Sequence, residues 1–284
     1  MKSRLLVAII CVPALFAVLV FAPDWATAVA VGLISVVSAW EFMGASDHAE
    51  SRGFGMWRVL SCALAALVCY GTFRAWDGIR GWLLALMYGL FALGLLIFLL
   101  NTARAHLRGG HVFTSISQCV IIAGLGLPLC LSAIIWLRIG GYGRYLVLVP
   151  IISAFITDAG AYAVGMTLGK HRPFPNISPK KSIEGFVGGL IIGTAAMVLF
   201  GVIMRTILPD TAHVSLVNLA IVGLAGAIVT EVGDLAFSLV KRERGIKDFG
   251  KLLPGHGGML DRFDSMVFCA PVVWALSLAF PVIW

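Results

Sequence analysis

Long apolar stretches, separated by short polar segments, run along nearly the whole chain. An α-helix crosses the hydrocarbon core of a bilayer with about 20 residues, and most of these stretches reach that length. The expected spans are residues 5–22, 25–44, 59–73, 81–100, 117–137, 145–168, 184–206, 215–240 and 259–284. The pattern therefore predicts an all-α polytopic membrane protein with about nine transmembrane helices.

The composition agrees with this prediction. The 284 residues are 60% hydrophobic and only 12% charged, and the mean hydropathy is +0.98. A soluble domain carries about 25% charged residues, so a soluble globular protein is excluded. A lipid bilayer is the expected partner, and no nucleic acid is expected.

Basic residues indicate how the chain is oriented. If the N-terminus is cytoplasmic, most of the 21 Lys and Arg residues fall on the cytoplasmic side, as the positive-inside rule requires. The C-terminus is then outside. Two strongly basic loops, residues 169–183 and 241–258, face the cytoplasm, where nucleotides are found.

The two halves of the chain differ in their chemistry. Residues 1–144 form the first five spans and contain no specific motif, and Glu41 at the end of the second span could be an interfacial residue. Residues 145–284 carry several acids within or beside apolar segments. An acid at the centre of a bilayer costs about 2.5–3.5 kcal/mol, so a group of them indicates a functional site. We therefore expect the C-terminal half to be catalytic.

Acidic residues gather where the eighth span ends and the ninth begins. Residues three or four positions apart share one face of a helix. The eighth span carries such a set: Glu231, Asp234, Ser238 and Lys241. Asp261 and Asp264 share a face at the start of the ninth span, and the loop between the spans lets the two acidic faces meet. Facing carboxylates are ligands that Mg²⁺ prefers.

Cations and glycines surround these acids, as a polyphosphate site would require. The cations are Lys241, Arg242, Arg244, Lys247, Lys251 and Arg262. Gly255, Gly257 and Gly258 permit unusual φ angles and a close approach of the backbone to phosphates. In the other basic loop, Ser182 is the expected N-cap of a helix, with Lys180 and Lys181 just before it.

The run SLVKRERGIKDFGKLLPGHGGMLDRFD, residues 238–264, resembles the signature of the phosphatidate cytidylyltransferases, the CDP-diacylglycerol synthases. That signature reads S-x-x-K-R-x₄-K-D-x₅-P-x-H-G-G-x-x-D-R-x-D, and every fixed position is met. SPKKSIEGFVGG, residues 178–189, is similar to a second stretch of the family, with Ser182 where Thr is usual. The N-terminal half shows no such motif.

The resemblance implies that CTP and phosphatidic acid react to give CDP-diacylglycerol and pyrophosphate in a Mg²⁺-dependent reaction, which a monovalent cation such as K⁺ can assist. It also implies that Asp234 and Asp261 hold metal. Asp264 and Glu231, which share helix faces with them, are our further candidates for metal ligands. The expected catalytic residues are Lys241, Arg242, Lys247, Asp248, His256 and Arg262. The expected substrate-binding residues are Ser178, Lys180, Lys181, Ser182, Ser238, Gly255, Gly257 and Gly258. A multi-pass protein of a bacterial inner membrane, with its active site facing the cytoplasm, is expected, and a homodimer is one possible assembly.

Two residues leave questions open. Family members commonly carry an acid just before the signature serine, and here that position is Phe237. We expect Glu231 to replace this acid in part. Asp158, in the middle of the sixth span, either supports a metal ligand or pairs helices.

Two other classes of function compete with this interpretation. A CTP-dependent lipid kinase of the polyprenol type would use the same nucleotide but transfer its γ-phosphate. An ion-coupled membrane transporter would also place acids within spans, but its charges would lie near the middle of the membrane. Here the charges lie at one end of the spans, which favours the transferase.

Overall fold

The computed structural model describes residues 13–47, 54–74, 116–209, 211–253, 255 and 257–284. Among these residues, seven helices are long and apolar enough to cross a membrane: Asp24–Ala45, Gly55–Arg74, Gln118–Ile139, Gly143–Thr167, Ile183–Ile207, Leu216–Glu243 and Leu260–Ala279. They correspond to seven of the nine predicted spans. Of the other two, residues 81–100 lie outside the described residues. Only 13–22 of the first span are described, and 13–21 form a helix. The predicted helical class is confirmed, since no strand forms in the described part of the chain.

The labelled helices follow one another along the described residues. In chain order they are α2 (Asp24–Asp47), α3 (Phe54–Arg74), α5 (Ile116–Ile121), the π-helical segment η2 (Ile122–Gly126), α6 (Leu127–Ile139), α7 (Gly143–Leu146), α8 (Leu148–Thr167), α9 (Ile183–Ile207), α10 (Leu216–Glu243) and α11 (Leu260–Ala279). The last helix ends at Ala279 rather than at residue 284. Pro281, which has no N–H to continue a helix, lies two residues further on. The final residues instead pair with residues 213–215, where the His213 N–H donates to the Trp284 carbonyl at 2.8 Å.

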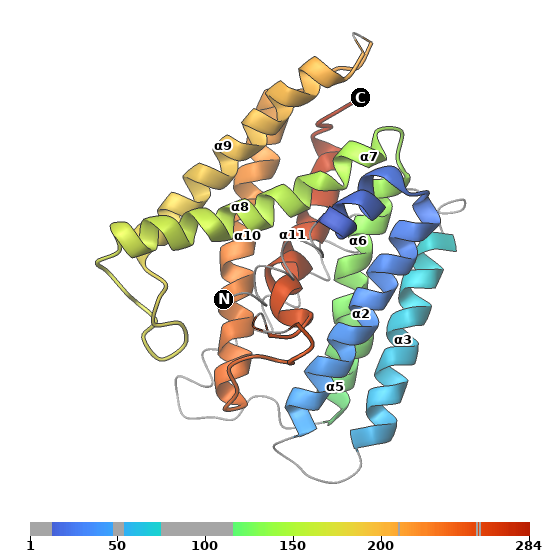
Figure 1. Cartoon of the computed structure of the whole chain (residues 1–284), viewed down its shortest axis with the longest axis vertical. Coiled ribbons are helices and arrows are strands. Elements are labelled where there is room, and N and C mark those ends of the chain that lie inside the picture. Colours follow the sequence, from blue (N-terminus) through green and yellow to red (C-terminus); the bar gives the residue numbers. More distant parts are fainter. Residues whose placement is uncertain (1–12, 48–53, 75–115, 210, 254, 256) are drawn as a thin grey trace.

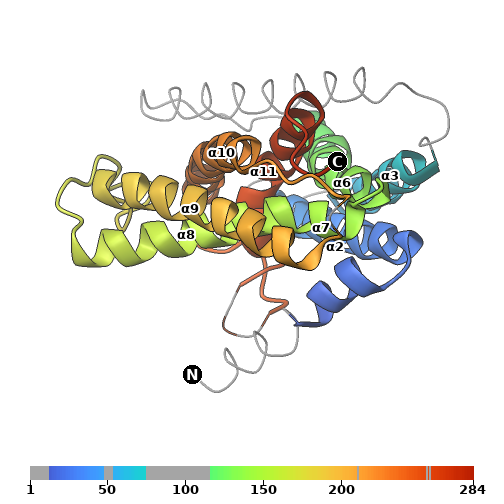
Figure 2. The ribbon, with the colours of Figure 1, turned by 90° about the horizontal axis from the view of Figure 1, so that it is seen from above.

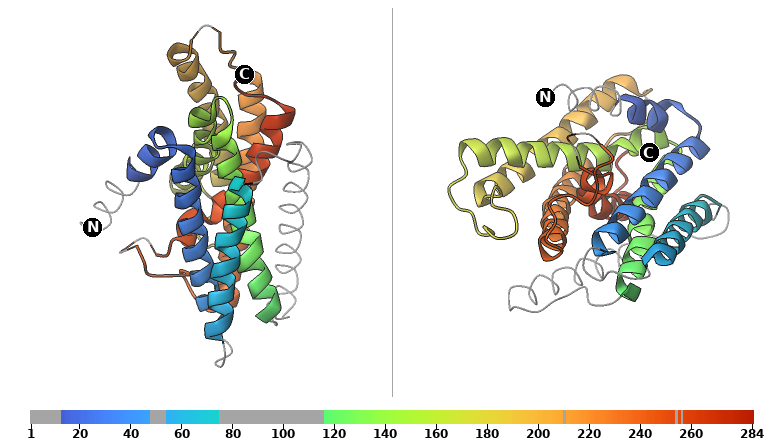
Figure 3. Two further views of the ribbon diagram at one scale, coloured as in Figure 1. Left: turned by 90° about the vertical axis from the view of Figure 1, so that its right-hand side faces the viewer. Right: turned by 60° about the horizontal axis from the view of Figure 1, so that its bottom comes forward.

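The helices form two groups joined by α10 and α11. One group contains α2, α3 and α6, which run side by side. The other is the pair α8 and α9, which is inclined to the first group (Figure 1). Figure 2 shows the α8–α9 pair as a separate layer beside α10 and α11. The views in Figure 3 place α11 between the two groups. This helix therefore links the N-terminal and C-terminal halves of the chain.

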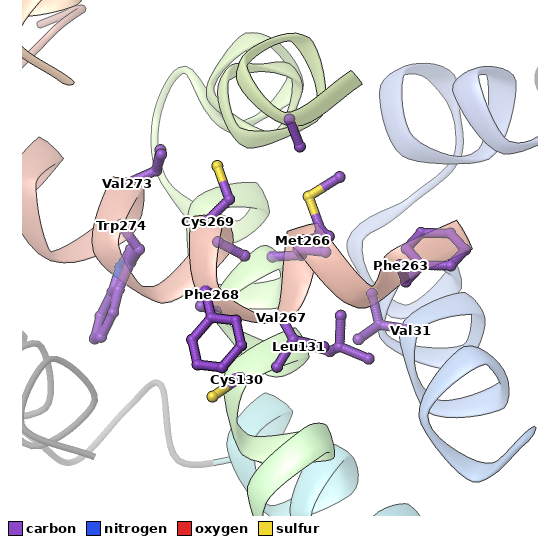
Figure 4. Packing of buried hydrophobic residues seen from close by; sticks show 14 of the residues in the cluster. Val31, Cys130, Leu131, Phe263, Met266, Val267, Phe268, Cys269, Val273 and Trp274 are labelled. Atoms are coloured by element: carbon purple, nitrogen blue, oxygen red, sulfur yellow. The ribbon is translucent and has the colours of Figure 1, made fainter. Parts of the chain in front are cut away.

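The core of the bundle lies around α11 (Figure 4). Most of its residues are buried, as expected of a helix that is apolar on every side after its charged first turns. Met266, Val267 and Phe268 point toward neighbouring helices, and Trp274 stacks on Trp136 of α6 with ring centroids 5.7 Å apart. The helix that carries Asp261 and Asp264 is thus held on several sides.

Small residues allow α8 and α9 to pack closely. A Cβ atom placed on Gly188 of α9 would come within 2.6 Å of the Val164 side chain on α8. A Cβ on Gly160 would come within 2.9 Å of Ile192. Close approach of small residues is the usual basis of helix packing within a bilayer.

An ion pair fixes the beginning of α2. Arg138, a buried residue of α6, contacts the Asp24 carboxylate at 2.6 Å and donates to the carbonyls of Leu19 and Ala22. These contacts tie the turn before α2 to the end of α6. They lie about 25 Å along α2 from Glu41, because the helix rises about 1.5 Å per residue.

The close packing of α8 on α9 predicts a specific loss of stability. Gly188→Ala should lower the melting temperature of the detergent-solubilised protein by several degrees, since overpacking costs about 1–3 kcal/mol. Gly71→Ala in α3 is the control, because a Cβ there meets no atom of the described residues within 4 Å. It should leave the melting temperature unchanged or raise it. Equal melting temperatures for wild type and Gly188→Ala would contradict the packing assigned to this helix pair.

Candidate active site

A cavity of about 720 Å³ lies where α8, α9, α10 and α11 meet the loop between α8 and α9. Five acids line it: Asp158 of α8, Glu231 and Asp234 of α10, and Asp261 and Asp264 of α11. Four cations line it as well: Lys180, Lys181, Lys241 and Arg262. The prediction that the acidic faces of the last two spans meet is confirmed.

Lys181 neutralises the two acids of α10. Its ammonium lies 2.9 Å from Glu231 Oε2 and 2.9 Å from Asp234 Oδ2, and it also donates to the Glu231 carbonyl. Burial by itself would lower the pKa of Lys181, but the two carboxylates outweigh it and hold the pKa above its usual value. The lysine therefore stays charged at neutral pH and compensates two largely buried carboxylates.

Lys241 does the same for the acids of α11. Its ammonium lies 3.1 Å from Asp261 Oδ1 and 3.3 Å from Asp264 Oδ2. The lysine belongs to the last turn of α10, so these contacts also join α10 to the start of α11. All three side chains are nearly buried, which favours full pairing of their charges.

Asp261 also holds the connecting loop. Its Oδ2 atom accepts hydrogen bonds from the backbone N–H groups of Phe249 at 2.8 Å and Gly258 at 2.9 Å. Its Oδ1 atom accepts from Lys241. Asp261 was predicted as a metal ligand, and it additionally fixes the fold of the loop that precedes its own helix.

Asp158 joins α8 to α11. Its Oδ2 atom accepts a hydrogen bond from Ser265 Oγ at 2.9 Å, and the residue also lines the cavity. Both interpretations of this acid, as a helix-pairing group and as a group beside the metal ligands, agree with its position.

The donor set fits Mg²⁺. No group of three or more metal-ligating side chains comes close enough together in the described part of the chain to hold an ion by itself. Mg²⁺ usually needs only one or two carboxylates, because waters and substrate phosphates complete its shell. Glu231 with Asp234, or Asp261 with Asp264, supplies such a pair. In addition, Glu231 Oε1 is buried with no hydrogen-bond partner among the described residues, so the first pair has acceptor capacity left.

The loop between α8 and α9 is held at both of its ends. Ser182 accepts a hydrogen bond from the Gly185 N–H at 3.0 Å, which confirms it as the N-cap of α9. Glu184 accepts from the N–H groups of Lys170 and His171 and contacts the His171 ring. Arg242 of α10 donates to the Ile177 carbonyl at 3.2 Å. These contacts present Ser178, Lys180 and Lys181 to the cavity.

Several predicted site residues lie elsewhere. Outside the cavity lining are Arg242, Lys247, Asp248, Ser238, Gly255, Gly257 and Gly258, whereas His256 is outside the described residues. Lys247 and Asp248 are exposed on the loop, and Ser238 is buried within α10. Arg242 connects the two loops, since it also donates to the Ile246 carbonyl. Of the cations predicted around the loop between α10 and α11, Lys241 and Arg262 line the cavity.

The glycines of the loop serve its fold. The unusual φ angles predicted for them are confirmed at Gly255 and Gly257, with values of 79° and 89°. The Gly258 N–H, however, donates to Asp261, and the Leu253 N–H donates to the Gly257 carbonyl. These backbone groups therefore bind other groups of the protein, and none of the three glycines lines the cavity.

Phe237 faces away from the cavity. It is buried against Phe249 of the loop and Phe268 of α11, with ring centroids 6.0 and 5.9 Å away. An aromatic residue at this position packs the loop against the bundle. Glu231 contacts Lys181 instead, so its side chain lies in a different place from that of residue 237. That Glu231 partly replaces the acid usual at position 237 stays a prediction.

Glu41 has a role that the sequence did not reveal. It is not an interfacial group, because it is only 7% exposed and accepts hydrogen bonds from the Met259 and Leu260 N–H groups. A lone charge at the end of a long apolar span was the available signal. Its partner lies more than two hundred residues away in the chain, so the sequence alone could not identify it.

Seven described helices are long and apolar enough to cross a membrane, and four of them line one charged cavity. Together they define a multi-pass membrane protein with a polar site inside its helix bundle. The chain belongs to the cytidylyltransferase family, whose model matches residues 2–280.

Named relatives agree with this assignment. The chain is 32% identical over 185 residues to the phosphatidate cytidylyltransferase of Bacillus subtilis, a match that covers 65% of this chain and 66% of the relative. It is 37% identical over 172 residues to the protein of the same name from Mycobacterium bovis, covering 61% of this chain and 54% of the relative. For the Staphylococcus saprophyticus protein of that name, the identity is 39% over 152 residues, covering 51% and 56%. The matches thus span about half to two thirds of the relatives' length, and the resemblance stated from the signature is confirmed.

The pairing of Lys181 can be tested by stability. Lys181→Gln should lower the melting temperature in detergent by several degrees, because it leaves Glu231 and Asp234 without their cation. Breaking a fully buried pair costs about 3–5 kcal/mol, and we expect about 2 kcal/mol here because Lys181 is partly exposed. Lys180→Gln is the control, since Lys180 makes no ion pair with a described residue.

The pH dependence gives a second readout for Lys181. A raised pKa means that the contribution of Lys181 is complete below the ordinary lysine value of 10.5 and is lost as the pH rises through the higher folded value. The difference between wild type and Lys181→Gln should therefore persist from neutral pH up to that value. A difference that vanished near neutral pH would show that Lys181 does not carry this charge.

Proposed function

We propose that this protein transfers the cytidylyl group of CTP to phosphatidic acid, releasing pyrophosphate and forming CDP-diacylglycerol. The observation that carries the proposal is the cavity, in which carboxylates from α8, α10 and α11 face four cations. A polyphosphate and its metal need this combination of groups. The names of the relatives supply phosphatidate as the acceptor and the cytidylyl group as the group transferred.

The cavity has a second, apolar part that suits a lipid. Tyr162 of α8, Phe186 of α9 and Leu235 of α10 line it beside the charged groups. Tyr162 is 59% exposed on a helix of transmembrane length, which would bring this side of the cavity toward lipid. A phosphatidic acid headgroup could reach the charged part while its acyl chains stay on the apolar side.

The chemistry needs no side-chain nucleophile. A phosphate monoester has a second pKa near 6 and is mostly dianionic at neutral pH. One of its oxygens attacks the α-phosphorus of CTP, the bond from that phosphorus to the bridging oxygen of the β-phosphate breaks, and pyrophosphate leaves with the electron pair. Lys180, Lys181, Lys241 and Arg262 are placed to reduce the repulsion between the two polyanions and to hold them in position.

Glu231, Asp234, Asp261 and Asp264 would hold Mg²⁺. When bound, this ion would neutralise phosphate oxygens and the charge that develops on pyrophosphate. Lys181 and Lys241 hold the same carboxylates in fixed orientations, so the acids are already directed at the cavity. A monovalent cation such as K⁺ is the further expected ion.

The proposed setting is a bacterial inner membrane, with the cavity on the cytoplasmic side. The end of α2, the loop between α8 and α9, and the loop between α10 and α11 all meet around the site, so they lie on one side of the bundle. The last two loops are the strongly basic ones, which favours the cytoplasmic side under the positive-inside rule.

Replacing an acid of α10 tests the assignment of the site. With phosphatidic acid in mixed micelles, Asp234→Asn should lower kcat for CDP-diacylglycerol formation by about a hundredfold or more, since one metal-holding carboxylate is lost. Removing Mg²⁺ with a chelator should abolish the wild-type activity. Glu243→Gln is the control on the same helix, because Glu243 does not line the cavity, and it should keep nearly full activity. Wild-type activity in Asp234→Asn would refute the metal role of this residue.

A further inference from the structure

The carboxylate of Glu41 binds the start of α11. Its Oε1 atom accepts from the Met259 N–H at 3.0 Å, and its Oε2 atom accepts from the Leu260 N–H at 2.9 Å. The first N–H groups of a helix have no partner within the helix, and a negative charge there is favourable. Both oxygens accept, which is the arrangement expected of an ionised carboxylate.

The bound N–H groups belong to the turn that carries Asp261. Asp261 itself accepts from the N–H of Gly258, directly before those held by Glu41. Two carboxylates, one from α2 and one from α11, therefore hold three successive N–H groups of the chain. Any shift of this turn would move the Asp261 carboxylate, which lines the cavity and pairs with Lys241.

Glycines in the loop between α10 and α11 leave space for the Glu41 side chain. A Cβ atom on Gly250 or on Gly258 would collide with the Glu41 carboxylate. The residue after Glu41 contributes too, because the Phe42 ring stacks on the Phe249 ring with centroids 5.8 Å apart. Phe249 in turn donates its N–H to Asp261. The end of α2 thus fits the loop in three ways: its carboxylate accepts from backbone N–H groups, the glycines leave space for it, and two aromatic rings stack.

We propose that Glu41 is a positioning residue of the N-terminal half, which sets the orientation of Asp261 for the reaction. This inference rests on the cytidylyltransferase function proposed above. Glu41 does not line the cavity, so it acts through the turn at residues 258–260 and not by touching a substrate. It gives the N-terminal helices, which carry no signature motif, a direct part in the site.

Glu41→Gln is the variant that tests this role with the least change in shape. The amide keeps one acceptor but turns an NH₂ group toward a backbone N–H, so one hydrogen bond is lost and two donors face each other. We expect kcat to fall at least tenfold and the Mg²⁺ concentration for half-maximal rate to rise severalfold. Without substrates or Mg²⁺, hydrogen–deuterium exchange at the amides of residues 258–260 should be at least tenfold faster than in wild type.

Asp24→Asn is the matched control on the same helix. It breaks another contact that ties α2 to the bundle, the ion pair with Arg138, but at the opposite end of the helix from the cavity. It should lower the melting temperature and leave kcat, the Mg²⁺ requirement and exchange at residues 258–260 as in wild type. If Glu41→Gln behaved in the same way as Asp24→Asn, Glu41 would be only a structural residue and the inference would be overturned.

A double-mutant cycle supplies a test that does not depend on one substitution folding well. Gly250→Ala should reduce kcat in wild type because the new Cβ collides with Glu41, and the same change should cost much less in a Glu41→Ala background, where space is free. Additive effects would contradict the contact.

The two proposals can fail separately. If the wild type is active and Glu41→Gln has the same kcat and Mg²⁺ requirement, only the positioning role of Glu41 is rejected. If the wild type does not form CDP-diacylglycerol, the proposed reaction is rejected, and with it the role of Glu41 in that reaction.

Discussion

Charge compensation inside the bundle is the constraint on which the rest of the structure depends. Five carboxylates line one cavity in a protein built mainly of apolar helices, and two lysines each pair with two of them. Without these lysines the acids would repel one another and would be costly to bury. The lysines come from different segments, Lys181 from the loop before α9 and Lys241 from α10, so pairing the charges also brings the segments together.

The same charges organise the loop between α10 and α11. Its backbone donors are used by Asp261 from one side and by Glu41 from the other, and its aromatic residue Phe249 packs between Phe42 and Phe237. The sequence predicts that this glycine-rich polar loop binds phosphates with its backbone N–H groups. Here the N–H groups of Phe249, Leu253 and residues 258–260 already have partners within the protein, and the loop fixes a carboxylate that faces the cavity.

Sequence reasoning predicted the local features well because they depend on neighbouring residues. The helical class, the positions of seven spans and the N-cap at Ser182 follow from apolar length and from capping chemistry. The shared face of Glu231, Asp234 and Lys241 follows from helical periodicity, and the structure brings all three to the cavity.

Long-range pairings could not be predicted in this way. Nothing near Glu41 in the chain points to Met259 or Leu260, and nothing near Phe237 shows that it packs against Phe249. The glycines of the signature suggested phosphate binding, since their chemistry allows it. The Gly258 N–H instead donates to Asp261, and Gly250 and Gly258 leave space for Glu41, which comes from the other half of the chain. The roles of Lys247 and Asp248, which are exposed outside the cavity, remain predictions from the signature.

The fate of the nucleotide's phosphates tests the proposed reaction most directly. Purified wild-type protein would be incubated with Mg²⁺, phosphatidic acid in mixed micelles and CTP labelled in either the α- or the γ-phosphate, and the lipid would then be extracted. Cytidylyl transfer predicts that the α-label appears in the lipid and the γ-label in pyrophosphate. Appearance of the γ-label in the lipid, with the α-label left in a soluble nucleotide, would contradict it.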